Sequence, residues 1–369
     1  MQDVFAEALR LVSSGERAAL STIVSSKGSL PMSKKAKMLV RADGKIVGTV
    51  GGGCLEADVW AEARQVMASG RPTLQAFVLT EKRAGDSGLT CGGTVEIFTE
   101  PLYPGRADTF LREISAIRTA RGSAALATLV SGGDETAEGA KYLIRADGAT
   151  HGTLGSPEAD AAVRDELEAE ATIPEDLLKV IDLEVKGQGA VKIFLESIAP
   201  EPTLYLFGGG HVSLAVARIA QTVGFRIVVI DDRAAFANRE RFPMADDTLV
   251  LDMETAFDRL EIDDLCYLIS VTRGHQHDKR VIAQAVKTSA AYIGMIGSRR
   301  KIALMWKELE AEGVTRSRLE DVHAPIGLDL GADTPEEIAV SIVAELIRTR
   351  RARGKPSHEA RSLSPVGTA

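Results

Sequence analysis

The chain has 369 residues, a formal net charge of −8 and an isoelectric point of about 5.5. Such an acidic chain is not expected to bind nucleic acid, because that interface needs a basic surface. No apolar run approaches the roughly 18 residues that a membrane-spanning helix needs, and the N-terminus lacks the basic start and apolar core of a signal peptide. Three cysteines do not form a disulfide framework in a chain of this length. We therefore expect a reduced, cytoplasmic protein of two or three domains, with no membrane partner.

The first 200 residues contain an internal repeat. The sequence KMLVRADG at residues 37–44 returns as KYLIRADG at 141–148, and GTVG at 48–51 returns as GTLG at 152–155. Two more matches flank these in the same order, ALSTIVS with ALATLVS and VEIF with VKIF. We predict a tandem duplication, with copies at about 1–101 and 106–199, that forms an N-terminal α+β domain of residues 1–199.

Each copy shows the same predicted order of elements. A helix comes first, at residues 4–13 in copy one and 108–120 in copy two. Two strands follow, joined by an Ala-Asp-Gly turn, and Asp-Gly is a favoured pair in tight hairpins. A further helix then leads to a last strand that ends in Ile-Phe.

The two copies differ in their glycines and cysteines. Copy one continues as GGGCLE at residues 51–56, where copy two reads GSPE at 155–158. Copy one then has LTCGG at 89–93, where copy two has KGQG. Purely structural glycines and cysteines would be equally useful in both copies, so the difference favours a site that contains Cys54 and Cys91. The alternative, two small hydrophobic side chains half-buried in tight turns, stays open.

A proline-rich linker, IAPEP at 198–202, precedes a predicted Rossmann-type nucleotide-binding domain at 203–352. Its strand LYLF leads into Gly208 and Gly210, which the motif requires for a tight turn and for close approach of a phosphate. Ser213 takes the place of the third small residue. Asp231 ends the next strand, about 20 residues on, and is expected to bind ribose hydroxyls. Arg233 leaves room for a phosphate on that ribose.

Further strands are predicted at 248–251, 267–271 and 292–296, with helices between them. The fold class is therefore α/β, with a doubly wound parallel sheet after the N-terminal α+β domain. Gly297 and Ser298 open a helix whose first turn, Arg299 to Lys301, carries three cations. Cations there oppose the helix dipole, so we expect a bound anion. A solvated basic face is the alternative.

Arg273, His275 and His277 follow the strand at 267–271. Alternating residues of a strand share one face, but a zinc site needs more ligands than neighbouring Asp278 supplies. An exposed or hydrogen-bonded histidine pair is expected, with His275 as a candidate general base. The sequence TPEE at 334–337 is a capping box that starts a last helix, ending near residue 350. Residues 353–369 are predicted to form a disordered tail.

Together these motifs resemble the XdhC/CoxI family of accessory factors for xanthine dehydrogenase and carbon monoxide dehydrogenase. The resemblance rests on GGGCLE, LTCGG, the Gly208 loop, RGH at 273–275, YIGMIGSRRK at 292–301, APIGLD at 324–329 and TPEEIA at 334–339. Similar proteins bind molybdenum cofactor, promote its sulfuration by a partner cysteine desulfurase and deliver it to an apo molybdenum hydroxylase. The resemblance implies the same maturation role for this chain.

The resemblance and the motifs define one candidate cofactor-binding set. Cys54 and Cys91 are predicted soft ligands to the molybdenum centre, because thiolates suit such metals. The pterin phosphate, or the nucleotide of the dinucleotide form, suits the glycine loop and the cluster at Arg299. The set consists of Gly51, Gly52, Gly53, Cys54, Glu56, Cys91, Gly208, Gly210, His211, Val212, Asp231, Arg233, Arg273, His275, Gly297, Ser298 and Arg299.

Two other functions stay open. An NAD(P)-dependent oxidoreductase would hold its nucleotide in the glycine loop and use His275 as acid or base, although no separate catalytic dyad is evident. A nucleotide-sensing regulatory protein would bind the nucleotide without turnover. A homodimer is compatible with a scaffold of this kind, and the sequence does not identify the client enzyme.

Overall fold

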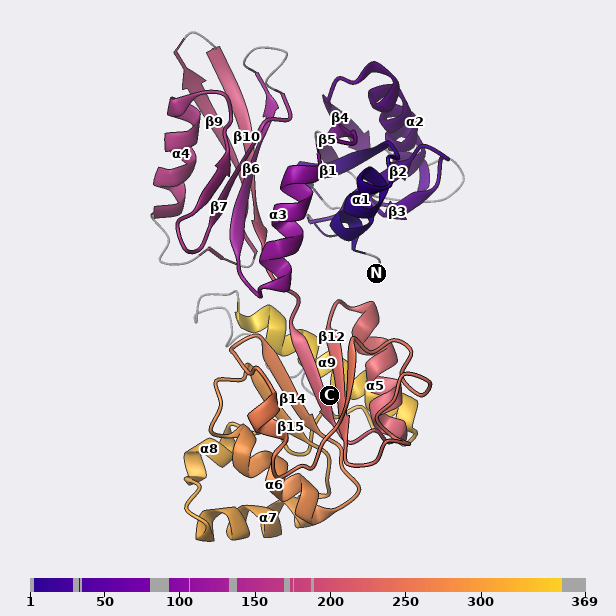
Figure 1. The fold of residues 1–369 in the computed structure, drawn as a ribbon, viewed down its shortest axis with the longest axis vertical. Coiled ribbons are helices and arrows are strands. Elements are labelled where there is room, and N and C mark those ends of the chain that lie inside the picture. The colour runs from indigo at the N-terminus through magenta and orange to yellow at the C-terminus, as the bar shows by residue number, and fades with distance from the viewer. Residues whose placement is uncertain are drawn as a thin grey trace, which may run out of the picture. The chain divides into compact units, whose positions relative to one another are not determined.

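The computed structural model describes residues 3–28, 33, 35–79, 93–105, 107–132, 138–168, 173–174, 176–186 and 189–353. The chain forms two compact units, one of residues 2–200 and one that begins at Glu201 (Figure 1). The first contains antiparallel sheets with helices, and the second contains a parallel sheet of five strands. The predicted fold class is therefore confirmed.

The first unit contains the same arrangement twice. Copy one consists of α1 (Val4–Ser13), β1 (Ala18–Gly28), β2 (Lys37–Arg41), β3 (Ile46–Gly48), α2 (Gly53–Ser69), β4 (Thr73–Leu79) and β5 (Gly93–Leu102). Copy two consists of α3 (Asp108–Thr119), β6 (Ala124–Ser131), β7 (Lys141–Arg145), β8 (Thr150–Gly152), α4 (Pro157–Glu168), β9 (Leu178–Val185) and β10 (Gly189–Ile198). The sheet orders, β3-β2-β1-β5-β4 and β8-β7-β6-β10-β9, correspond strand for strand. The prediction from sequence had three strands in each copy where the structure has five, because it gave two strands instead of three before the second helix and omitted β4 and β9.

Helices on both faces bury the central strand of copy one. On one face Ile23 and Met38 pack against Leu55 and Val59 of α2. On the other face Leu20 belongs to a cluster that includes the buried side of α1. Residues 18–24 of β1 are therefore buried without interruption, which explains why the sequence ALSTIVS shows no regular alternation of apolar and polar residues.

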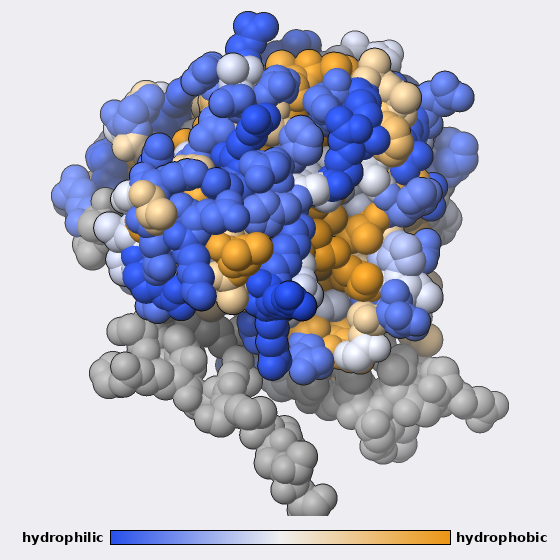
Figure 2. Space-filling view, turned by 90° about the horizontal axis from the view of Figure 1, so that it is seen from below, coloured by the Kyte–Doolittle hydropathy of each residue, from blue (hydrophilic) through white to orange (hydrophobic). Residues whose placement is uncertain are grey.

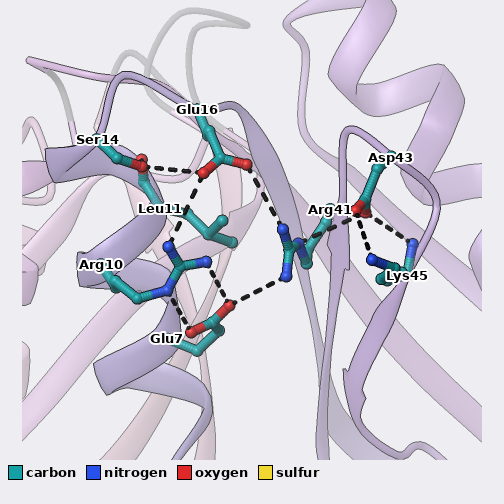
Figure 3. A network of polar contacts seen from close by, with 8 residues as sticks. All are labelled: Glu7, Arg10, Leu11, Ser14, Glu16, Arg41, Asp43 and Lys45. Carbon is teal, nitrogen blue, oxygen red and sulfur yellow. Dashed lines mark hydrogen bonds and ion pairs between the residues drawn. The ribbon is translucent and has the colours of Figure 1, made fainter.

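A network of charged side chains joins α1 to the hairpin of β2 and β3 (Figure 3). The guanidinium of Arg41 lies 3.6 Å from Glu7, 3.7 Å from Glu16 and 3.5 Å from Asp43. A hydrogen bond from Arg10 lowers the pKa of the Glu7 carboxyl. Copy two repeats part of this network, since Arg145 lies 3.4 Å from Asp147. The repeated RADG sequence therefore has a structural role in both copies.

The two copies pack on each other through a small apolar core and two crossed ion pairs. The buried core contains Val24 and Phe98 from copy one with Val130 and Phe194 from copy two. Lys37 Nζ of copy one lies 2.9 Å from Glu196 of copy two, and Lys141 Nζ of copy two lies 2.8 Å from Glu100 of copy one. Each lysine also contacts a threonine of its own copy at 3.3 Å. The reciprocal pattern is that of a two-fold interface in a homodimer, contained here in one chain.

Replacing Lys141 by methionine is expected to lower the unfolding free energy of the first unit by about 2 kcal/mol, because Glu100 loses its partner. Glu100 is 8% exposed, so water does not fully replace the lost contact. The measurement is urea unfolding followed by Trp60 fluorescence in a Trp306→Phe background, since the chain has two tryptophans. As a control, Lys179→Met breaks the ion pair of Lys179 with Glu166, whose side chains are 48% and 31% exposed. It should lower the unfolding free energy by less than about 1 kcal/mol. Equal losses in the two variants would contradict the prediction.

The second unit is a doubly wound Rossmann fold. Its elements are β11 (Thr203–Phe207), α5 (His211–Thr222), β12 (Arg226–Asp231), β13 (Asp247–Val250), the 3-10 helix η2 (Ala256–Arg259), β14 (Cys266–Ser270), α6 (His275–Ala285), β15 (Tyr292–Met295), α7 (Arg299–Ala311), α8 (Arg316–Glu320) and α9 (Pro335–Arg353). The strand order is β13-β12-β11-β14-β15, with all pairs parallel. Between β13 and β14 the structure has only the short η2 where a helix was expected.

Apolar clusters on both faces of this sheet form its core. One cluster joins β11, β14 and β15 to α6 and α7, and the other joins the same sheet to α5 and α9. Seen from below, the surface shows separate orange patches among blue, hydrophilic side chains (Figure 2). The exposed large apolar residues of the second unit, Val250, Leu304, Leu330 and Val340, lie in β13, in α7, in the loop before α9 and in α9. Single exposed apolar side chains of this kind are ordinary on a protein surface.

Candidate functional site

The glycine loop after β11 is closely packed at its first two positions and open at the third. Gly208 has a φ of 104°, and a Cβ there would lie 2.5 Å from the carbonyl oxygen of Val271. A Cβ on Gly209 would lie 2.2 Å from the carbonyl oxygen of Phe236. No atom lies within 4 Å of the Cβ position of Gly210. The loop therefore packs against the protein on one side and presents Gly210 to open space, as a phosphate-binding loop requires.

Three side chains fix the polar groups of this loop. Ser213 Oγ donates to the Gly208 carbonyl, so the serine that departs from the glycine motif ties the loop to α5. The Gly209 amide donates to Asp231 at 2.8 Å. Arg241 Nε donates to the Gly209 carbonyl at 2.9 Å. Ser213 and Arg241 were not predicted to do this, and no motif in the sequence connects Arg241 with the loop.

The start of α5 leaves backbone donors free for a ligand. The helix has Gly210 as its N-cap, without a side-chain capping bond, and the first helical hydrogen bond runs from Leu214 to Gly210. Within the described residues, the amides of Gly210, His211 and Val212 make no hydrogen bond. Free amides at a helix N-terminus form a site for an anion such as a phosphate. The predicted loop residues are therefore brought together.

Asp231 is already saturated with hydrogen bonds. It is 2% exposed and accepts the Gly209 amide, the Arg233 amide and two N–H groups of the Arg233 guanidinium. Burial raises the pKa of the Asp231 carboxyl, but these hydrogen bonds outweigh it and lower the pKa overall. A carboxylate has about four acceptor positions, and all are used. Asp231 therefore braces the loop and Arg233, and it has no acceptor left for a ribose unless Arg233 moves.

Arg273 lies across the loop from Arg233. Its guanidinium donates to Asp232 at 2.8 Å, and Arg233 lies 3.6 Å from the same carboxylate. Arg273 follows β14 and Asp232 follows β12, so this contact spans the carboxyl end of β11 between them. Ligands bind at this edge of a doubly wound sheet, where the strand order reverses.

The cations after β15 have an internal counter-charge that the sequence analysis missed. Ser298 caps α7 by accepting the Lys301 amide at 3.3 Å, and Lys301 Nζ lies 2.6 Å from Asp278 of α6. Asp278 is fully buried. The expected compensating anion is therefore partly supplied by the protein, and of the three cations Arg299 and Arg300 remain exposed at the helix start.

The structure places the two histidines on a helix, which corrects the strand-based argument. His275 and His277 lie in the first turn of α6, where residues two apart point in different directions. His275 Nε2 is buried, lies 3.6 Å from Glu308 and makes no hydrogen bond. Within the described residues no group of three or more His, Cys, Asp or Glu side chains could hold a metal. A general-base role for His275 stays a prediction.

In the first unit, the predicted loop of residues 51–54 forms an open helix start. Gly51, Gly52 and Gly53 have φ values of 142°, 70° and 62°, a run that other residues rarely adopt. The N-cap of α2 is Gly52 and makes no side-chain bond, and Cys54 is exposed with a free thiol. This arrangement leaves the first amides of α2 and the thiol of Cys54 on one loop.

Copy two closes the equivalent helix start. Ser156, which corresponds to Gly52, is buried and accepts hydrogen bonds from the amides of Glu158 and Ala159 at 3.2 and 3.4 Å. Pro157 follows it as the first residue of α4, where a proline needs no partner for its nitrogen. The capped helix of copy two shows that the fold does not require the open glycine loop of copy one.

Glu56 has a structural partner in both copies. Its carboxylate accepts a hydrogen bond from Thr49, and the corresponding Asp160 accepts one from Thr153. Because both copies keep this bond, the side chain of Glu56 stabilises the loop. Its contact with a cofactor stays a prediction. Cys91 lies outside the described residues, so its pairing with Cys54 in one site stays a prediction.

None of the helices in the described ranges is long and apolar enough to cross a lipid bilayer. A family model described as the XdhC Rossmann domain matches residues 204–346. A second, described as the XdhC and CoxI family, matches residues 11–78 and 117–173, one stretch in each copy of the repeat.

Two curated bacterial proteins are similar along most of their length. A probable xanthine dehydrogenase subunit of Bacillus subtilis (strain 168) is 28% identical over 348 residues, which cover 92% of this chain and 96% of the relative. The molybdenum cofactor insertion chaperone PaoD of Escherichia coli (strain K12) is 22% identical over 349 residues, 93% of this chain and 86% of PaoD.

A solved structure extends the similarity to the fold of the whole chain. The crystal structure of a xanthine dehydrogenase from Bacillus halodurans has a TM-score of 0.77 and 25% identity, and the match covers 98% of both chains. The family models, the relatives and the two-unit fold agree with the motifs at the glycine loops. The chain belongs to the XdhC and CoxI family.

Proposed function

We propose that this chain is a xanthine dehydrogenase accessory factor that binds molybdenum cofactor and supports its insertion into a molybdenum hydroxylase. Membership of the XdhC and CoxI family supports the accessory role, and the similarity to PaoD supports the cofactor. The observation that carries the proposal is the difference between the two copies. Copy one exposes Cys54 and uncapped amides at a loop that copy two closes with Ser156.

The groups present fit the chemistry of this cofactor. A thiolate suits a soft metal–sulfur centre, and the exposed Cys54 can provide one. Free amides at Gly210, His211 and Val212 suit the phosphate of the pterin or of its nucleotide. The bound cofactor would supply the molybdenum centre that the client enzyme uses, while this chain holds it. Gly51, Gly53 and Cys91 belong to the same proposed thiol site.

The finer parts of the proposal concern partners. A cysteine desulfurase would deliver sulfur to the held cofactor, and an apo molybdenum hydroxylase would then receive it. Both hand-overs need a cofactor that partner proteins can reach, and Cys54 is exposed at the start of α2. Loops on a rigid scaffold commonly carry such binding groups. A homodimer with two such sites remains compatible with this scheme.

The test is a graft of the copy-two loop into copy one. Gly52→Ser, Gly53→Pro and Cys54→Glu together reproduce the capped start of α4, which folds without glycine at these places. Cys54→Ser alone removes only the thiol. Protein purified from a molybdenum-replete host is assayed for molybdenum by metal analysis and for pterin by fluorescence after oxidation. We expect the wild type to carry both and each variant to lose at least about 90% of the molybdenum, which is a difference above 1.4 kcal/mol in binding.

A matched control alters the capped loop, which we expect to leave the cofactor in place. Ser156→Ala in copy two removes both capping hydrogen bonds and should lower the free energy of unfolding by about 1 kcal/mol without changing the molybdenum content. Wild-type protein that carries NAD and no pterin would favour the oxidoreductase and overturn the proposal. So would Cys54→Ser protein with unchanged molybdenum. A partner hydroxylase whose activity does not rise on co-expression would contradict the insertion step.

A further inference from the structure

We propose that Arg241 is a positioning residue of the Rossmann unit that aims the Gly210 amide at the diphosphate group of a nucleotide. The inference deepens the proposed function and rests on it for the identity of the natural ligand, which would be the dinucleotide form of the cofactor. The phosphate chemistry itself rests on the structure alone. It can therefore be tested with simple nucleotides, independently of molybdenum.

One peptide bond connects Arg241 with the Gly210 amide. Arg241 Nε donates to the carbonyl of Gly209 at 2.9 Å. In a trans peptide plane the carbonyl and the following N–H point in opposite directions. The N–H of Gly210 therefore points away from Arg241, and nothing lies within 4 Å of the Gly210 Cβ position. Arg241 thus sets the direction of an amide that makes no hydrogen bond within the described residues, at a glycine whose Cβ position is open.

The guanidinium of Arg241 is held beside two aromatic rings. Its guanidinium lies 5.3 Å from the ring centre of Phe236 and 5.9 Å from that of Phe242. Its own amide donates to the side chain of Asn238 at 2.9 Å. Arg233 stacks on the same Phe236 ring at 3.5 Å, so one ring contacts both arginines. A cation on an aromatic face is held by the ring's negative potential, which makes the direction of the Arg241 side chain well defined.

Arg241 has one hydrogen-bond donor that is not used within the described residues. Its Nη2 is buried and has no hydrogen-bond partner among the described residues. No ion pair of Arg241 with a carboxylate is found there either, whereas Arg233 is paired with Asp231. A buried N–H of a charged group without a partner is costly. Arg241 therefore places a positive charge, without a carboxylate partner in the described part of the chain, behind the glycine loop, on the side of the peptide opposite to the Gly210 N–H.

These observations point to a diphosphate as the ligand group. The three free amides from Gly210 to Val212 suit one phosphate, and the additional positive charge of Arg241 behind the loop favours a second negative group nearby. Asp231 has no free acceptor for a ribose. Recognition should therefore depend on the phosphates more than on the ribose.

The experiment compares nucleotide binding by the full-length wild type, Arg241→Met and Arg241→Lys. The probes are ADP and CDP, with adenosine and cytidine as ligands without phosphate, and affinity is measured by calorimetry. We expect Arg241→Met to weaken binding of the diphosphates at least tenfold and to leave any nucleoside binding unchanged. Arg241→Lys should recover part of the loss, because it restores a donor and the charge but lacks the planar fork.

Arg239→Met is the matched structural control. Arg239 lies in the same segment and donates to the carbonyls of Ala245 and Asp246, with no bond to the glycine loop. It should lower the melting temperature without weakening diphosphate binding at temperatures where the protein is folded. Equal affinity for ADP and CDP in the wild type and Arg241→Met would overturn the inference. So would a wild type that binds neither diphosphate, or equal losses in Arg239→Met and Arg241→Met.

The nucleotide-binding test of Arg241 and the molybdenum test of the proposed function can fail independently of each other. A wild type that binds diphosphates through Arg241 but carries no molybdenum supports the inference and contradicts the cofactor role. A wild type that carries molybdenum while Arg241→Met keeps full diphosphate binding supports the cofactor role and contradicts the inference.

Discussion

Replacing Asp278 by asparagine is expected to destabilise the Rossmann unit by about 3–5 kcal/mol, the usual cost of removing one partner from a buried ion pair. Asp278 is fully buried, and one carboxylate oxygen lies 2.6 Å from Lys301 Nζ. The other accepts bonds from the hydroxyls of Ser270 and Thr272 at 2.7 Å and from the Thr272 amide at 3.2 Å. Asparagine has the same shape but no charge. Its amide N–H group would face side chains and an amide that are themselves hydrogen-bond donors.

The measurement is urea unfolding followed by Trp306, which is 7% exposed on α7, in a Trp60→Phe background. Glu312→Gln is the control, because it removes a carboxylate that is 53% exposed and lies 2.6 Å from Lys279 of α6, directly after the end of α7. It should change the unfolding free energy by less than about 1 kcal/mol. If the unfolding free energy fell no further in Asp278→Asn than in Glu312→Gln, the buried ion pair would contribute little to stability.

The second large effect is a dependence of stability on acid that originates at Glu345. This buried carboxylate of α9 accepts hydrogen bonds from Tyr292 at 2.7 Å and from the Gly327 amide at 2.8 Å, and it lies 3.2 Å from His323 and 3.0 Å from Arg348. Burial raises the pKa of the Glu345 carboxyl, but His323, Tyr292 and the Gly327 amide outweigh it and lower the pKa to about 2, against an ordinary value of 4.5.

Because the folded pKa is the lower one, this stabilisation is complete above about pH 4.5 and is lost as the pH falls toward 2. The difference corresponds to on the order of 3 kcal/mol. Unfolding is followed by Trp306 fluorescence. We expect the wild type to have a larger free energy of unfolding than Glu345→Gln at pH 4.5, and we expect this difference to shrink as the pH falls to 2.5. A constant difference between the two proteins over that range would contradict this assignment.

The Rossmann elements were predictable because their signals are local. The strand at 204–207, the glycine turn and the start of α5 lie within about ten consecutive residues, and the structure has them where expected. The strands predicted at 267–271 and 292–296 are observed as β14 (Cys266–Ser270) and β15 (Tyr292–Met295). The repeat likewise predicted equivalent secondary structure in both copies, since similar sequences favour the same local elements.

The functional assignments of single residues were less predictable, because they depend on partners far along the chain. Lys301 looked like part of an anion site until the fold placed Asp278, 23 residues earlier, beside it. Asp231, which was predicted to bind ribose, is engaged by Arg233 and the Gly209 amide, a set of partners that the sequence motif did not indicate. His275 and His277 were treated as strand residues, although the helix that begins at His275 separates them.

The sequence by itself determined the two-part organisation, the duplication, the Rossmann unit and the difference between GGGC in copy one and GSPE in copy two. These are properties of neighbouring residues, and a pattern of neighbours is enough to specify them. Only the tertiary structure decided which polar groups are satisfied and which are left free. It did so because Ser156 closes the helix start of copy two, while Arg241 reaches back over 32 residues to donate to the Gly209 carbonyl of the Rossmann glycine loop.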